Sequence, residues 1–337
     1  MYYSNNDIRL KEMPVPEAGR GEIVIRIHAS GICGSDVLEW YRAGKTPLVL
    51  GHEIAGEIVE VGDGVTSYRK GQRVSASHHV PCNTCHYCLS DHHSVCETLR
   101  TTKFYPGGFS EYVRLPQINV DRGVYLLPSD MSYEEATFIE PLGCVLRGQR
   151  FAKVSVGSRV LIIGSGISGL LHIQLAKALG ASLVVSTDVK EFRLNAAKRL
   201  GADEAIHASK DIPLEFRKLN GRGADVVILT TGAPNAIEQA LSSVDRGGTV
   251  LFFAPSGEGY KHPIPINDLF WRKEITLTSS YAANYNEHMT ALELIHQGKV
   301  NVREMITHRL PLSEAQKGFQ LVEKGDESIK VIIEPWR

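Results

Sequence analysis

Four cysteines in one short polar stretch constrain this chain more than any other feature. Cys82, Cys85, Cys88 and Cys96 follow the pattern Cys-x2-Cys-x2-Cys-x7-Cys. Thiolates at this spacing can converge on one tetrahedral Zn²⁺, at about 2.3 Å each. Because four protein ligands leave no coordination position for a substrate, the expected zinc site is structural. A catalytic metal in the same chain would need a second, more open set of ligands.

The composition is that of an ordinary globular protein with room for two domains. The chain has 337 residues, of which 43% are hydrophobic and 22% are charged, and domains typically hold roughly 100 to 200 residues. Lys and Arg number 37 against 38 Asp and Glu. This balance argues against nucleic acid or a membrane surface as a partner. We therefore expect a small molecule as the partner.

The chain also carries patterns that bear on its location. Residues 1–9 have neither the basic region nor the apolar core of a signal peptide. No apolar run approaches the roughly 18 residues that cross a bilayer. Six cysteines, four of them in one loop, fit metal binding in a reducing compartment better than a disulfide framework. We expect a cytoplasmic protein.

Two patterns of secondary structure follow one another along the chain. From residue 21 to about residue 74, short β-branched runs punctuated by glycine predict an irregular, mostly β domain, and 107–114 returns to a strand pattern. From about residue 157, strands alternate with helices, which predicts a parallel, doubly wound sheet. The expected strands are 22–27, 54–61, 159–163, 182–186, 224–229 and 248–253, and the expected helices are 168–179, 191–200 and 235–243. Residues 329–334 predict a final strand that returns to the first domain.

A glycine-rich loop lies where the first strand of the second half meets its helix. Gly164-Ser-Gly166-Ile167-Ser168-Gly169 has the GxGxxG spacing, with a strand before it and a helix after it. In this context the glycines allow a tight turn, close approach of a pyrophosphate and close helix packing. The helix amino terminus then faces the phosphates. We predict a dinucleotide site.

An acidic residue follows the loop at the distance that nucleotide recognition requires. Asp188 ends the next expected strand, where a carboxylate can accept both ribose hydroxyls and repel the extra phosphate of NADP. NAD is therefore favoured, although the nearby cations Lys190 and Arg193 could reduce the repulsion of NADP. The alternative for Asp188 is a solvated residue at a strand end.

A second, more open set of possible zinc ligands precedes the cysteine loop. Cys33 lies in Gly-Ile-Cys-Gly-Ser-Asp and His52 in Gly-His-Glu. A catalytic zinc takes three protein ligands and leaves the fourth position open. Glu53, Glu140 and Cys144 are candidates for the third ligand, and Cys144 is more simply interpreted as core packing.

These motifs together resemble the zinc-containing alcohol dehydrogenases of the medium-chain dehydrogenase/reductase superfamily. The Gly51-His52-Glu53 signature, the four-cysteine lobe and the GxGxxG loop occur in that family's order, over essentially the whole chain. The segments Cys33-Gly-Ser-Asp-Val and Glu140-Pro-Leu are most similar to the sorbitol (polyol) and threonine dehydrogenase branches.

The resemblance implies an α/β two-domain fold with the active site between the domains. Residues 1–146 and 283–337 would form a GroES-like, mostly β catalytic domain with two zinc sites. Residues 147–282 would form a Rossmann domain that binds NAD. Cys33, His52 and Glu140 would hold the catalytic zinc, with Glu53 as an alternate or water-linked ligand. The same resemblance implies a homodimer or homotetramer.

Further roles follow from the resemblance in the same way. Asp36 would fix the tautomer of His52, and Ser35 would take the alcohol proton, unless it is only a turn serine. Relatives often have His where this chain has Leu38, and His where it has Arg147. A histidine-terminated proton relay is therefore not expected, and Arg147 is either a substrate contact or half of a structural ion pair. Substrate-lining candidates are Leu38, Trp40, Phe104, Arg147 and Tyr281. His78, His79, His86, His92 and His93 are interpreted as loop residues.

The expected function is oxidation of a secondary alcohol, most simply of a polyol or sugar-like substrate, to a ketone with zinc and NAD. One alternative is an L-threonine 3-dehydrogenase-like enzyme that acts on a 3-hydroxy amino acid. Another is a nucleotide-binding relative that has lost catalysis.

Overall fold

The chain forms two compact units in the computed structural model, which describes all 337 residues. The β unit comprises Met1–Gly143, Ala282–Gly298 and Val302–Arg337. The α/β unit comprises Cys144–Tyr281 and Lys299–Asn301. The first unit is therefore discontinuous in sequence, because the chain leaves it near residue 143 and returns to it at residue 282.

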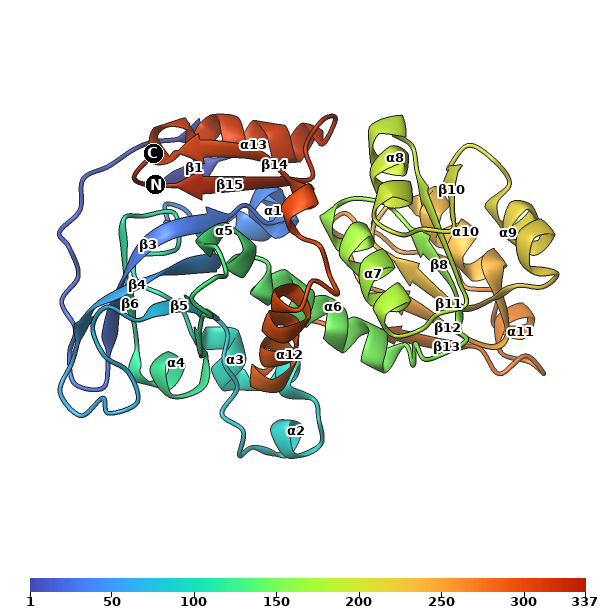
Figure 1. The fold of residues 1–337 in the computed structure, drawn as a ribbon. Helices are drawn as coiled ribbons and strands as arrows, with labels where there is room; N and C mark the ends of the chain where they lie inside the picture. The colour runs from blue at the N-terminus through green and yellow to red at the C-terminus, as the bar shows by residue number, and fades with distance from the viewer. The chain divides into compact units, whose positions relative to one another are not determined.

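The β unit is built on a seven-stranded sheet with the strand order β14-β15-β3-β4-β5-β7, to which β6 adds by pairing with β3 (Figure 1). Its core forms because alternate residues of β3, among them Ile23, Ile25 and Ile27, are almost fully buried. The strands are β3 (Ile23–Gly31), β4 (Glu53–Val61), β5 (Arg73–Ala76), β6 (Tyr112–Leu115), β7 (Val124–Leu126), β14 (Ile306–Pro311) and β15 (Lys330–Glu334), with a separate pair β1 (Tyr2–Ser4) and β2 (Asp7–Ile8).

Short helices and loops surround this sheet. The α-helices are α1 (Glu39–Arg42), α2 (His86–Leu89), α3 (Glu97–Thr101), α4 (Gln117–Arg122), α5 (Tyr133–Ala136), α12 (Tyr285–His296) and α13 (Ala315–Lys324). The 3-10 helices are η1 (Gly34–Val37), η2 (His93–Val95), η3 (Arg303–Met305) and η4 (Leu312–Glu314). Most of the residues expected to bind metal lie in these connections, as is common for functional residues.

The carboxyl-terminal strand completes the β unit. β15 pairs with β14 in parallel and with β3 in antiparallel, where Ile332 lies opposite Gly31 and Ile333 opposite Ser30. The expectation that the last strand returns to the first domain is confirmed. This pairing brings the start of β15 close to the chain that leads into the metal ligands.

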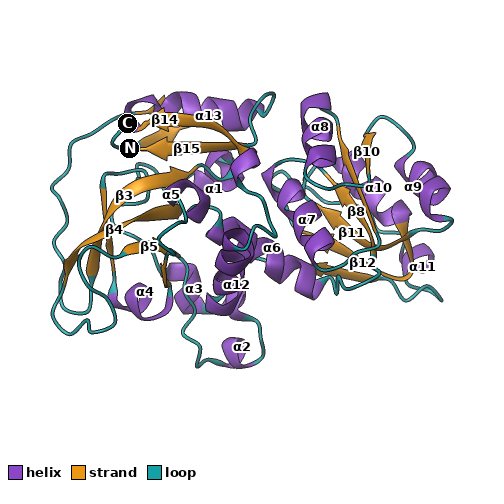
Figure 2. Ribbon diagram, in the orientation of Figure 1, coloured by secondary structure: helices purple, strands orange, loops and turns teal.

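The α/β unit contains a parallel six-stranded sheet with the order β10-β9-β8-β11-β12-β13. Figure 2 shows helices on both faces of this sheet, with α7 and α8 on one and α9 and α10 on the other. The strands are β8 (Arg159–Ile163), β9 (Leu183–Asp188), β10 (Glu204–His207), β11 (Ala224–Leu229), β12 (Val244–Phe252) and β13 (Thr276–Ser279). The helices are α7 (Ile167–Ala178), α8 (Glu191–Arg199), α9 (Ile212–Asn220), α10 (Pro234–Ser243) and α11 (Ile266–Leu269), while α6 (Ile139–Phe151) begins in the β unit and continues into this one.

The expected elements agree with this architecture, and the fold class of a mostly β domain plus a doubly wound sheet is confirmed. The strand predicted at 224–229 coincides with β11, and those predicted at 22–27 and 54–61 lie within or beside β3 and β4. The sequence patterns missed both edge strands of the second sheet. β10 and β13 are only four residues long, and β13 is partly exposed, so neither carries a long apolar run. None of the helices combines the length and the apolar character that a membrane span requires.

Candidate metal centres and coenzyme loop

The four cysteines of the 82–96 loop form one compact group. Their sulfur atoms all lie within 4.8 Å of one another. Cys88 Sγ lies 3.9 Å from Cys82 Sγ and 3.6 Å from Cys85 Sγ. Four Zn–S bonds of 2.3 Å at tetrahedral angles place sulfurs about 3.8 Å apart. The geometry therefore fits a structural Zn²⁺.

Local backbone structure holds these thiols in place. Cys85 and Cys96 stand directly before α2 and α3, and the amides of Cys82 and Cys85 donate to the sulfurs of Cys96 (3.4 Å) and Cys82 (3.3 Å). Hydrogen bonds from Thr84 and Cys85 lower the pKa of Cys82 to about 5, whereas burial and the neighbouring sulfurs raise the pKa of Cys88 to about 12. Thiols this close cannot all ionise without a cation, which the zinc ion would supply.

The second ligand group gathers around the start of β4. Cys33 Sγ, a ring nitrogen of His52 and a carboxylate oxygen of Glu53 all lie within 4.8 Å of one another. Cys33 is the N-cap of η1, where its sulfur accepts hydrogen bonds from both the amide and the hydroxyl of Ser35, each at 3.4 Å. A thiolate, an imidazole and a carboxylate are suitable zinc ligands, and three of them leave a position open.

Asp36 orients the histidine of this group. The carboxylate of Asp36 is fully buried and lies 3.5 Å from His52 Nδ1, while its other oxygen accepts from the amide of Cys33 at 3.1 Å. Burial opposes charge on the imidazole, but Asp36 and Cys33 outweigh it and raise the pKa of His52 well above its usual value. Burial likewise opposes charge on Asp36, and His52 and Arg42 overcome it to lower the pKa of that carboxyl. With Nδ1 turned to Asp36, Nε2 is the nitrogen available to a metal.

Glu53 has a cationic partner that was not predicted from the sequence. Lys330, the first residue of β15, donates from Nζ to Glu53 Oε2 and also to the carbonyl oxygen of Ile32, at 3.3 Å. Both ionic side chains are buried. A Cβ on Gly31 would overlap both groups, so glycine is required there. The only sequence signal for this pair was a lysine at the start of an otherwise apolar strand.

Two further neighbours of the group were also missed. Arg42, at the end of α1, contacts both Ser35 and Asp36. His78 lies with its ring centre 4.7 Å from that of His52 and 3.6 Å from that of His79. Burial, together with neighbouring imidazoles and Arg42, keeps the pKa of His78 well below its usual value and lowers that of His79 to about 4. Both rings are therefore neutral near pH 7.

The remaining loop histidines lie outside both ligand groups. His86 and His92 are exposed, and His93 is half-buried with Nδ1 3.5 Å from Asp91. Neither Glu140 nor Cys144 belongs to the three-residue group around Cys33. Glu140 lies in the first turn of α6, and Cys144 lies one turn later on the same helix. The assignment of Glu140 as a zinc ligand stays a prediction.

The glycine loop has the conformation expected of a dinucleotide site. Gly164 follows β8 with a φ of 102°, and Gly166 is the N-cap of α7, so that Ile167 and Ser168 form its first turn. A Cβ on Gly169 would overlap the carbonyl oxygen of Gly164. Only glycine allows this approach of helix and turn.

Asp188 lies beside this loop at the end of β9. Its Oδ2 accepts from the amide of Ser165 at 2.8 Å, and its Oδ1 from the amide of Lys190 at 3.0 Å. Arg193 Nη1 lies 3.9 Å from the same carboxylate. The structure therefore brings Asp188, Arg193 and the glycine loop together in one unit.

The candidate substrate contacts differ in their surroundings. The ring of Phe104 is buried, with its centre 6.1 Å from that of His78, and Leu38 directly follows η1. Trp40 and Tyr281 are exposed. Arg147 is buried, and its guanidinium lies 4.5 Å from the ring centre of Phe151 on the same helix.

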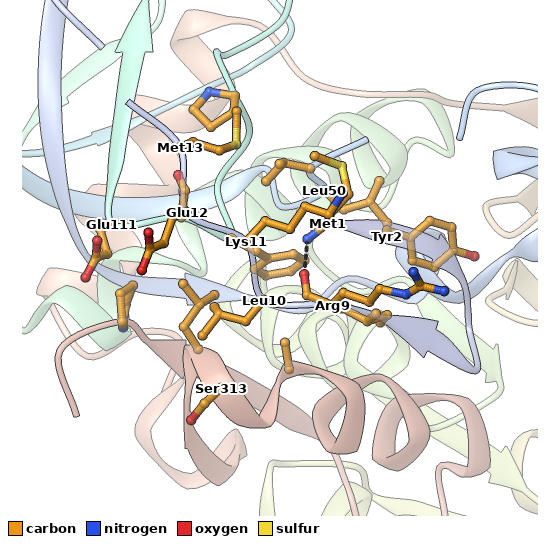
Figure 3. A pocket seen from close by; sticks show the side chains of 18 of the residues that line it. Met1, Tyr2, Arg9, Leu10, Lys11, Glu12, Met13, Leu50, Glu111 and Ser313 are labelled. Carbon is orange, nitrogen blue, oxygen red and sulfur yellow. Dashed lines mark hydrogen bonds between the residues drawn. The ribbon is translucent and has the colours of Figure 1, made fainter. Parts of the chain in front are cut away.

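One cavity of the β unit is lined by none of these residues. It measures about 470 Å³ and is bounded by the first residues of the chain, by Leu50 and by Ser313 (Figure 3). At its edge the terminal amine of Met1 donates to the carbonyl oxygen of Arg9 at 2.8 Å. No residue of the two metal groups or of the glycine loop lines it.

Comparisons with known proteins agree with both units. Residues 19–129 match the alcohol dehydrogenase GroES-like domain, and residues 168–297 match the zinc-binding dehydrogenase family. An L-threonine 3-dehydrogenase of Bacillus licheniformis is 35% identical over 96% of this chain and 94% of its own length. A sorbitol dehydrogenase of Bacillus subtilis is 33% identical over 99% of this chain and 96% of its own. The crystal structure of a zinc-binding dehydrogenase from Sinorhizobium meliloti bound to NADP is 27% identical, with a TM-score of 0.87 over 98% of this chain and 97% of that one.

A GroES-like unit with two metal-ligand groups, joined to a Rossmann unit, defines a zinc-dependent dehydrogenase. The chain belongs to the zinc-containing alcohol dehydrogenase family, within its sorbitol and threonine dehydrogenase branches. Its relatives include threonine, sorbitol and butanediol dehydrogenases, and together with the family these support a zinc-dependent dehydrogenase of secondary alcohols.

Proposed function

We propose that this chain oxidises a secondary hydroxyl of a polyol or sugar-like substrate to a ketone, with NAD as the hydride acceptor. The observation that carries the proposal is the intact group of Cys33, His52 and Glu53, with Asp36 holding the histidine. An intact group of this kind argues against a relative that has lost catalysis. A zinc ion held there acts as a Lewis acid that lowers the pKa of an alcohol.

The chain's own residues prepare the reaction around that ion. Asp36 keeps His52 Nδ1 occupied, so that Nε2 faces the metal position. Ser35 lies next to Cys33, where its hydroxyl can accept the proton of the alcohol. Glu140, from the first turn of α6, is proposed as the third protein ligand, and Glu53, engaged by Lys330, as the alternate one.

NAD is preferred over NADP in this proposal because of Asp188. Its buried carboxylate lies at the end of β9 beside the glycine loop, where it would accept ribose hydroxyls and repel a 2′-phosphate. Arg193, close to the same carboxylate, makes NADP the alternative to test, and the Sinorhizobium meliloti structure was determined with NADP.

A second candidate is the oxidation of a 3-hydroxy amino acid such as L-threonine. It is favoured by the 35% identity to a threonine dehydrogenase, which is similar to the 33% identity to a sorbitol dehydrogenase. The two candidates share the metal group and the hydride transfer, and differ only in the substrate.

The test measures NADH formation by the zinc-loaded protein with a panel of polyols, sugar acids and L-threonine. We expect turnover of at least one polyol or sugar-like alcohol, and its loss in His52→Gln. His92→Gln is the matched control, because His92 is an exposed histidine outside both ligand groups. Turnover of threonine alone would refute the polyol proposal, and normal NAD binding without zinc at the Cys33 group would support the non-catalytic alternative.

The partners and location complete the proposal. We propose a homodimer or homotetramer, to be tested by sedimentation, and no nucleic acid or membrane partner, in keeping with the balanced charge. None of the six cysteines forms a disulfide, which supports a reducing compartment such as the cytoplasm.

A further inference from the structure

Arg42 reaches back from α1 to the turn that holds Cys33. Its Nη2 lies 3.4 Å from the hydroxyl of Ser35 and 3.1 Å from Oδ1 of Asp36. Its Nε donates to the carbonyl oxygen of Ser35 at 3.2 Å. One guanidinium therefore contacts both the serine beside Cys33 and the carboxylate that faces His52.

The chemistry of these groups settles the direction of the hydrogen bonds. A guanidinium only donates, and it keeps its protons at any ordinary pH. The Ser35 hydroxyl must accept from Arg42, which leaves its own O–H free to donate to Cys33 Sγ at 3.4 Å. A hydroxyl oxygen has two lone pairs. One of them thus remains for the proton of an alcohol.

Apart from Cys33, Arg42 is the residue whose side chain makes a hydrogen bond to the Ser35 hydroxyl. Leu38, which stands where relatives often have histidine, has no polar atom to offer. Arg42 also lines a cavity of about 310 Å³ together with Glu39, Trp40 and Thr46. Its Nη1 makes no hydrogen bond within the protein. Solvent can therefore reach the guanidinium on the side away from Ser35.

We propose that Arg42 is a positioning residue for alcohol oxidation, which holds the Ser35 hydroxyl ready to accept the alcohol proton. The proposal rests on the proposed function. In the step, the alcohol O–H bond breaks and its proton bonds to Ser35 Oγ. The original Ser35 O–H turns from Cys33 Sγ to a solvent water and breaks as its proton passes to that water, so Ser35 is neutral before and after the step. Arg42 keeps all its protons and contributes only its hydrogen bond and its charge.

The competing explanation is that the hydrogen bonds of Arg42 only stabilise the turn at residues 33–36. Arg42→Met removes both the charge and the hydrogen bonds, whereas Arg42→Lys keeps the charge. Lys45→Met is the matched control, because the side chains of Arg42 and Lys45 both lie over the Tyr41 ring but only Arg42 reaches Ser35. Zinc content and NAD affinity are measured for every variant.

In Arg42→Met we expect kcat to fall about tenfold or more, with the zinc content retained. The solvent deuterium isotope effect on kcat should rise, because removal of the alcohol proton becomes slower. The affinity of the enzyme–NADH complex for the alcohol, measured by fluorescence without turnover, should change less than about threefold. Arg42→Lys should recover most of the rate, and Lys45→Met should behave as the native protein.

A double variant separates the two explanations further. Leu38→His adds an imidazole next to this turn, and in combination with Arg42→Met it should restore part of the lost rate if proton removal is what Arg42 assists. An unchanged isotope effect in Arg42→Met, or a loss of zinc that explains the loss of rate, would overturn the proposal. Should Arg42→Met not fold, Arg42→Gln, which keeps a neutral donor, is measured in its place against Arg42→Lys.

These outcomes are distinct from failure of the proposed function. If the native protein oxidises no alcohol of the panel, the proposed function fails before any variant is made. If it oxidises alcohols and Arg42→Met has the native kcat and isotope effect, only the role of Arg42 is refuted.

Discussion

Lys330 Nζ donates a hydrogen bond to Glu53 Oε2, although the two residues are 277 positions apart in the chain. The lysine side chain is 0% exposed and that of the glutamate 1%, and the ring centre of Phe138 lies 5.5 Å from Nζ. A buried ion pair contributes little net stability, but removing one partner leaves an uncompensated charge. The pair therefore ties the last strand of the chain to the start of β4, next to the predicted catalytic metal.

Lys330→Met tests this relationship. We expect the free energy of unfolding of the β unit to fall by about 3 to 5 kcal/mol, because Glu53 remains buried without its cation. The measurement is urea denaturation of the zinc-loaded protein. The double variant Glu53→Gln with Lys330→Met should recover a large part of the loss, and equal losses in the single and double variants would contradict the account.

Cys96→Ser tests whether the four-cysteine group holds a structural zinc and the Cys33 group the catalytic one. We expect bound zinc to fall from two ions per chain to one, and the melting temperature to fall by about 5 to 10 °C, because the buried Cys96 sulfur completes the four-thiol group. Metal analysis and thermal unfolding measure the two effects, with Cys144→Ser as the control cysteine. A Cys96→Ser protein that keeps both ions and full stability but cannot turn over would reverse the assignment.

Asp188→Ser tests coenzyme selection. The substitution removes the charge that repels a 2′-phosphate and leaves Arg193 Nη1 nearby. We expect the ratio of NADP to NAD affinity to rise about tenfold or more, which corresponds to about 1.4 kcal/mol. Fluorescence titration with each reduced coenzyme measures the ratio. The control is Asp203→Asn in the same unit, since Asp203 pairs with Lys177 rather than with the loop, and an unchanged ratio in Asp188→Ser would refute the role of the carboxylate.

His172 predicts a pH dependence of the α/β unit. The ring is buried in α7 beside Gln149, and burial lowers its pKa to about 3. In the unfolded chain the pKa is near 6.5, so the unfolded state binds more protons and stability is lost as the pH falls from about 6.5 towards 3. Between pH 7.5 and pH 5 this loss amounts to about 2 kcal/mol.

The comparison of wild type with His172→Leu isolates that contribution. The variant should lose about 2 kcal/mol less than the wild type over the same pH interval, as followed by urea denaturation. His207→Leu is the control, since that imidazole is partly exposed and bonded to Ser209. Parallel pH profiles for the wild type and His172→Leu would contradict the prediction.

Much of the fold could be inferred from local patterns. β11 and α10 follow from apolar runs bounded by glycine and proline, and the loop from Gly164 to Gly169 follows from the need for close backbone approach. β10 and β13 were missed because edge strands of four residues bury too little surface to leave a pattern. Helix α6 was missed because its apolar residues are interrupted by Pro141 and Gly143.

The amino-acid sequence by itself determined the four-cysteine group, the coenzyme loop and the family, and it singled out Cys33 and His52, because ligand spacing and glycine conformation are local properties of the chain. Only the tertiary structure decided which charged groups meet around Cys33 and His52. Lys330 reaches Glu53 because of the register in which β15 pairs with β3. Arg42, at the end of α1, reaches Ser35 in η1 because the chain turns between these two helices. His78 approaches His52 from the end of β5. Such contacts depend on strand register and loop path, which no run of neighbouring residues encodes. The four-cysteine loop is the most conspicuous motif of the sequence, whereas the residues proposed for chemistry are assembled by the fold.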